Sequence, residues 1–155
     1  MEYFELTFFC PKGEYKEESV DVIEKQLKGN YNFGRESFVE FFSDKEKGYS
    51  EFRLNISDFK ITKETFNNVI EYLSQFVSVI FTEMHKIEIA TGVYELTYYL
   101  VSQEKKWNLS DFDSDFMKKF PIVFYRAGHE FDHENVVFSD ENVICVFHKD
   151  AQNIF

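Results

Sequence analysis

The strongest constraint on the fold is one long amphipathic helix that lies between stretches of strand-like alternation. Its apolar residues follow one another at three- and four-residue steps: Phe66, Val69, Ile70, Leu73, Phe76 and Val77. Thr62 provides a suitable start for this helix. A helix with a single apolar stripe must bury that stripe, so we expect it to lie on a sheet formed by the neighbouring strands.

Two strand regions and a short helix are predicted before this long helix. Alternation in residues 2–10 places Phe4, Leu6, Phe8 and Cys10 on one side, which is typical of a half-buried strand. Ser19 precedes the short helix, and Gly29 just past its last turn stops it. The runs 38–42 and 51–56, joined by a polar link, then predict a β-hairpin.

The second half of the chain is expected to add more strands and a third helix. Residues 79–101 are rich in β-branched and aromatic side chains, and Gly92 marks either a turn between two strands or a strand-to-helix junction. We favour two strands, the second from Val93 to Val101. Ser110 and the acids after it predict a helix that ends before Pro121. Strands are expected near residues 122–125, 136–138 and 143–148.

These elements predict one α+β domain over residues 1–155, with a largely antiparallel sheet and about three helices packed on one face. Apolar residues make up 44% of the chain, enough to form a core despite the charge.

The charge balance points to a basic partner. The chain carries 28 acidic and 17 basic side chains, which gives a formal net charge of -11. A nucleic acid would be repelled, because its binding depends on a basic surface that releases counterions from the phosphates. A basic protein would be attracted at long range.

The cysteines and the N-terminal sequence favour a cytoplasmic protein that does not enter the membrane. Cys10 and Cys145 each lie in an apolar, strand-like run, so we expect two reduced core cysteines. The first residues, MEYFELTFF, lack the basic flank of a signal peptide. The most apolar stretch, Phe76 to Phe81, is too short to cross a bilayer.

One local motif raises the possibility of a zinc enzyme. The sequence His129-Glu130-Phe131-Asp132-His133 matches H-E-x-x-H, in which two histidines one helical turn apart bind zinc. The segment HEFDHENVVFSD resembles the helix motif of peptide deformylases, which implies a metal-dependent hydrolase with His129 and His133 as ligands. However, Glu134 stands where that motif has leucine, and the other two deformylase motifs are absent.

The surroundings of this motif favour a loop instead. Gly128 precedes it, and the strand-like residues 136–138 follow at once. We therefore expect no cofactor and no catalysis, and keep the zinc hydrolase as the alternative.

The last third of the chain groups acids around aromatic residues, which is typical of a protein interface with aromatic anchors and a charged rim. The alternative is a solvated acidic surface above ordinary core aromatics. The predicted partner-binding residues are Trp107, Asp111, Asp113, Asp115, Glu130, Phe131, Asp132, Glu134, Asp140 and Glu141.

In its overall profile the chain resembles the immunity proteins of bacterial toxin systems, including those of contact-dependent growth inhibition. The shared features are small size, acidic charge, reduced cysteines and the acidic-aromatic grouping. The resemblance implies that the protein binds and neutralises a cognate toxin, commonly a basic nuclease. A non-catalytic adaptor domain is the remaining alternative.

Overall fold

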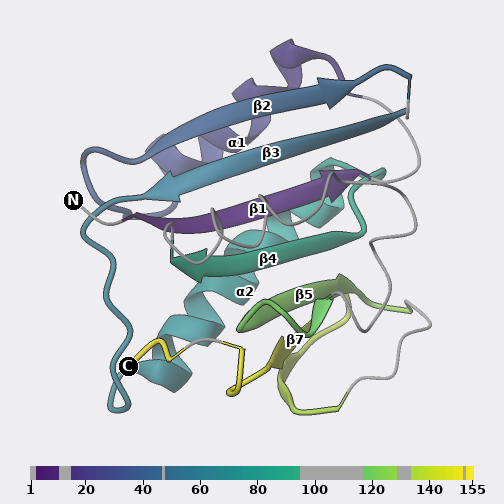
Figure 1. Cartoon of the computed structure of the whole chain (residues 1–155). Helices are drawn as coiled ribbons and strands as arrows, with labels where there is room; N and C mark the ends of the chain where they lie inside the picture. The colour runs from purple at the N-terminus through teal and green to yellow at the C-terminus, as the bar shows by residue number, and fades with distance from the viewer. Residues whose placement is uncertain (1–2, 11–14, 47, 95–116, 129–133, 152) are drawn as a thin grey trace.

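The described strands of the chain form one sheet of seven strands. The computed structural model describes residues 3–10, 15–46, 48–94, 117–128, 134–151 and 153–155. The strands are β1 (Phe4–Cys10), β2 (Phe38–Asp44), β3 (Tyr49–Ile56), β4 (Ile89–Tyr94), β5 (Ile122–Arg126), β6 (Val136–Ser139) and β7 (Val143–Phe147). Their order in the sheet is β2-β3-β1-β4-β5-β7-β6, and neighbouring strands are antiparallel throughout (Figure 1).

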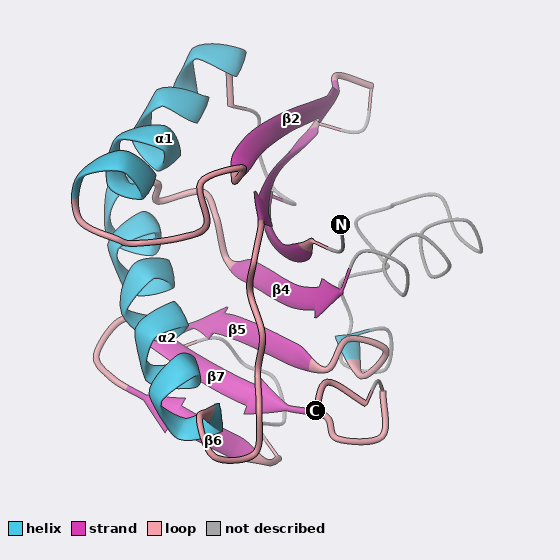
Figure 2. Ribbon diagram, turned by 90° about the vertical axis from the view of Figure 1, so that its left-hand side faces the viewer, coloured by secondary structure: helices cyan, strands magenta, loops and turns pink. Residues whose placement is uncertain are grey.

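The helices cover one face of this sheet. They are the short 3-10 helix η1 (Glu17–Ser19), α1 (Val20–Gly29) and α2 (Phe66–Glu83). Figure 2 shows α1 and α2 on the same side of the strands. The α+β prediction is therefore confirmed, but the described residues contain two α-helices instead of about three. Most of the third expected helix, residues 110–116, lies outside the described residues, and residues 118 and 119 form a turn.

Strand β1 is buried on both faces, so the prediction of a half-buried strand is wrong. Phe4, Leu6 and Phe8 face the helices in the main core. Phe9 lies on the opposite face in a second apolar cluster with Val123 and other residues of β4 and β5. All seven residues of β1 are buried. Alternation of polarity indicated which side faces the helices, but it could not show that the other side is covered as well.

The region after residue 78 also differs from the prediction. Helix α2 continues to Glu83 through residues that were expected to form a strand, because Ile80 and Phe81 extend its buried stripe. Gly92 lies inside β4 instead of in a turn. A Cβ atom at Gly92 would lie 2.7 Å from Cζ of Phe4, so the missing side chain leaves room for that ring. Residues 95–101 of the other expected strand lie outside the described residues.

Arg126 joins the end of α2 to the sheet. Its Nε donates to the Ile87 carbonyl at 2.9 Å, and its Nη2 donates to the Met84 carbonyl at 3.1 Å and also to that of Ile87. Its guanidinium carbon lies 5.0 Å from the ring centroid of Phe81. A cation at this position complements the negative end of the α2 dipole. Burial lowers the pKa of Arg126, but an arginine remains charged at neutral pH.

Replacing Gly92 with alanine is expected to destabilise the protein by about 1–3 kcal/mol, because the new methyl group would displace the Phe4 ring. Urea unfolding measures this loss. The matched control is Gly29→Ala in α1, where a Cβ meets no atom within 4 Å and no loss is expected. Equal stability of the two variants would show that Phe4 does not need this space.

Replacing Arg126 with methionine is expected to lower the free energy of unfolding by about 1.5–3 kcal/mol, the range for hydrogen bonds to a charged group. Methionine keeps an apolar stem against Phe81 but leaves the Met84 and Ile87 carbonyls without this donor. The control is Arg35→Met on an exposed arginine, which should change stability little. The same loss in both variants would contradict the role given to Arg126.

Candidate functional site

Three of the predicted partner-binding residues lie in the described part of the chain. All three are exposed: Glu134 precedes β6, and Asp140 and Glu141 lie in the turn between β6 and β7. The others lie outside the described residues: Trp107, Asp111, Asp113, Asp115, Glu130, Phe131 and Asp132. Oδ1 of Asp140 accepts hydrogen bonds from the backbone amides of Asn142 at 2.7 Å and Val143 at 2.8 Å. Asp140 therefore also closes the hairpin turn.

The H-E-x-x-H segment, residues 129–133, lies outside the described residues. It falls between the end of β5 at Arg126 and the start of β6 at Val136. No group of three or more metal-ligating side chains occurs in the part of the chain that the structure describes. The zinc alternative with His129 and His133 therefore stays a prediction.

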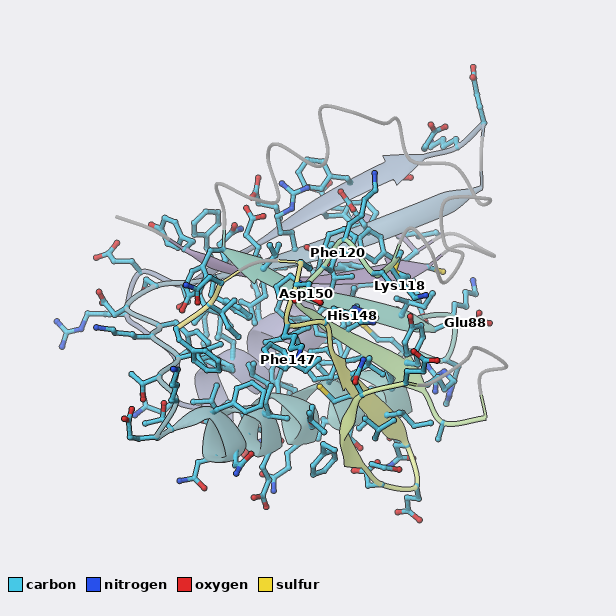
Figure 3. All side chains as sticks on the ribbon, turned by 60° about the horizontal axis from the view of Figure 1, so that its bottom comes forward. Glu88, Lys118, Phe120, Phe147, His148 and Asp150 are labelled. Carbon is cyan, nitrogen blue, oxygen red and sulfur yellow. The ribbon has the colours of Figure 1, made fainter. Side chains whose placement is uncertain are left out.

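His148 has a structural role at the end of β7. Its Nδ1 lies 3.0 Å from the carbonyl oxygen of Phe120, and its backbone amide donates to the Pro121 carbonyl at 2.7 Å. Figure 3 shows His148 and Phe120 on neighbouring segments. These bonds join the C-terminal segment to the residues that lead into β5.

An open acidic groove lies between the start of α1 and β2. It consists of two adjoining depressions of about 420 and 650 Å³, which share Glu17, Glu18 and Phe41 as lining residues. We call it the acidic groove. Among the described residues, its lining consists of Tyr15, Lys16, Glu17, Glu18, Val20, Asp21, Glu24, Val39, Phe41, Ser43 and Lys45.

Helical spacing places the carboxylates along one wall of the acidic groove. Glu17, Asp21 and Glu24 follow one another at steps of four and three residues, so they share one side of the η1–α1 segment. Acids near the start of a helix are also stabilised by its dipole. The buried Ile23 and the half-buried Leu27 of α1 pack against the main core, which leaves the acidic side facing outward.

Strand β2 forms the floor of the acidic groove and one edge of the sheet. Val39 and Phe41 face the helices and are half-buried. Phe38 and Phe42 point to the other face and are 44% and 39% exposed. Within the described residues β2 forms a ladder only with β3. The strand therefore presents apolar side chains to solvent on both of its faces.

Polar contacts on the face away from the helices fix β2 against the rest of the sheet. Nδ2 of Asn55 donates to Oε1 of Glu40 at 2.9 Å, which joins β3 to β2. Nη2 of Arg53 lies 3.2 Å from Oε1 of Glu51, and its guanidinium carbon lies 4.8 Å from the ring centroid of Phe42. These contacts hold the edge strand β2 in a defined register with β3.

The acidic groove is not among the predicted contact surfaces, which all lie in the last third of the chain. The spacing of Glu17, Asp21 and Glu24 opposite an apolar stripe indicates an acidic helix side. No sequence pattern indicates that β2 lies beside this helix at the edge of the sheet, because that position depends on strand order.

Comparisons with known proteins add no family. No protein-family model, no curated protein and no solved structure matches this chain. Among the described helices, none combines the length and the apolar composition needed to cross a bilayer.

Cys10 and Cys145 are thiols outside any disulfide and are completely buried, and burial raises the pKa of the Cys145 thiol. We expect neither thiol to react with a thiol-specific disulfide reagent near pH 8, since the reactive thiolate is disfavoured and inaccessible. Both should react once the protein is unfolded in denaturant. Rapid reaction of either thiol in the folded protein, measured by absorbance, would contradict their placement.

Proposed function

We propose that this protein is an immunity protein that binds and neutralises a cognate toxin domain with a basic surface, of the nuclease type. The observation that carries the proposal is the acidic groove, where carboxylates surround an apolar floor at the edge of the sheet. This combination suits a protein interface with an apolar centre and a charged rim.

The acidic charge of the protein favours a basic partner both at long range and at direct contact. The net charge of -11 attracts a basic protein before contact and raises the association rate. At contact, the described part of the groove lining offers the four carboxylates of Glu17, Glu18, Asp21 and Glu24 against the two ammonium groups of Lys16 and Lys45. Lysine and arginine side chains of the partner would find several carboxylates within reach.

The apolar floor supports a lasting contact. Val20, Val39 and Phe41 are half-buried in the free protein, so a partner in the groove would remove their remaining surface from water. Buried aromatic and aliphatic groups slow dissociation, whereas exposed charges mainly affect association.

The hairpin acids Glu134, Asp140 and Glu141 form a second acidic surface at the opposite edge of the sheet. Together with the other acids of the last third they add to the long-range field and remain proposed contacts. We place the main contact at the acidic groove, because there the acids line a hollow with an apolar floor.

The proposed function predicts that a toxin-domain reading frame lies immediately upstream of the gene, and the product of that frame is the partner to test. We expect the two proteins to form a complex whose affinity falls as salt is raised, measured by isothermal titration calorimetry. Neutralising the groove with Glu17→Gln, Glu18→Gln, Asp21→Asn and Glu24→Gln should weaken binding about fourfold or more, since each of the four exposed ion pairs contributes about 0.2–1 kcal/mol.

The matched control neutralises the hairpin with Glu134→Gln, Asp140→Asn and Glu141→Gln. Asparagine keeps the oxygen that closes the hairpin turn, so this variant should fold normally and bind with a smaller loss. A larger loss in the hairpin variant would move the main contact to β6–β7. Affinity that does not change with salt or with either variant would contradict the proposed function.

A further inference from the structure

We propose, resting on the proposed function, that the partner adds an extended segment of alternating basic and apolar residues to the edge of β2 that forms no ladder within the described residues. Main-chain hydrogen bonds to Phe38–Phe42 would hold the segment, and the acidic groove would select its basic side chains. The partner class is therefore a protein with an exposed basic strand or loop.

The two edges of the sheet differ in their protection against strand addition. Edge strand β6 has four residues, and its register with β7 is interrupted between Val136 and Phe138. Short length and a bulge are common ways to prevent pairing with another chain. Strand β2 has seven residues, runs in continuous register with β3 and contains no proline.

The composition of β2 also favours pairing. Residues 38–42 read Phe-Val-Glu-Phe-Phe, so Glu40 is the one charged side chain in this stretch. An edge strand of this length and hydrophobicity is a template for another strand. The hydrogen bond from Asn55 to Glu40 further ties this acid to β3.

The surroundings of β2 define the pattern of the added strand. Successive side chains of a strand point to opposite faces of the sheet. On the helix side they would meet Glu17, Asp21 and Glu24 in the acidic groove. On the other side they would meet the exposed rings of Phe38 and Phe42. The matching segment therefore places lysine or arginine on the groove side and apolar residues on the opposite side.

Charge argues against a second copy of this chain as the occupant. Two copies with a net charge of -11 each repel one another. Pairing of β2 with a second β2 would also bring two acidic grooves close together. A basic strand from another protein is attracted by this charge and brings no second acidic groove.

The experiment measures hydrogen exchange of the backbone amides in the full-length protein by NMR. The probe is a capped peptide of alternating lysine and valine, of the same length as β2. The control is the same peptide with every backbone nitrogen methylated, which keeps the charge and the side chains but removes the amide donors. A second control is a peptide of the same composition with its lysines and valines in separate blocks.

We expect the alternating peptide to slow exchange at every second amide of residues 38–42, because alternate amides of an edge strand point away from the sheet. The methylated and the block peptides should bind at least about tenfold more weakly, since they lose the main-chain bonds or the match to both faces. Exchange in β6 should stay unchanged.

Three results would overturn strand addition, each in a different way. If all three peptides bind equally, with salt dependence but without protection in β2, strand addition is wrong and the proposed function stands. If no peptide binds at low salt, both strand addition and the proposed function are wrong. Alternating protection without peptide, together with a dimer in sedimentation, identifies a second copy of the chain as the occupant.

Discussion

The fold depends on the burial of β1 between two apolar layers. Its helix-facing side packs against α2 in the main core, and Phe9 on the other side belongs to a second cluster with residues of β4 and β5. Burial on both faces makes β1 the centre around which the other strands are arranged. Gly92 of β4 serves the same packing, because its missing side chain accommodates the ring of Phe4.

The central position of β1 decides which surfaces are free for binding. Strand β3 pairs with one side of β1, so the β2–β3 hairpin places β2 at the edge of the sheet. Helix α1 precedes β2 in the chain and lies beside it on the helix-covered face, so that acids of α1 and apolar residues of β2 line the same hollow. The acidic groove is thus a consequence of the strand order. The packing of the core and the position of the candidate recognition surface therefore depend on the same strand order.

Much of the fold was predictable from local patterns. Alternation identified the β2–β3 hairpin and the strands β5 to β7, and helical spacing identified α1 and most of α2. The errors have physical reasons. Helix α2 extends to Glu83 because tertiary packing overrides the strand preference of Val79 and Ile80, and Gly92 resembles a turn residue although it serves close packing inside β4.

The candidate site was less predictable than the fold. Net charge predicts acidic surfaces but not their place, because the position of the groove depends on contacts between α1 and β2 that no short motif encodes. Asp140 illustrates the same limit, since sequence cannot distinguish an acid that meets a partner from one that closes a turn.

The most direct test of recognition at the α1–β2 edge is site-specific photocrosslinking. A benzophenone side chain is placed at Phe42 on β2 or at Val137 on β6, both exposed, and each protein is irradiated with the toxin domain that we expect a reading frame directly upstream of the gene to encode. We expect a crosslinked complex from position 42, which high salt during irradiation suppresses. Crosslinking from position 137 alone would contradict it.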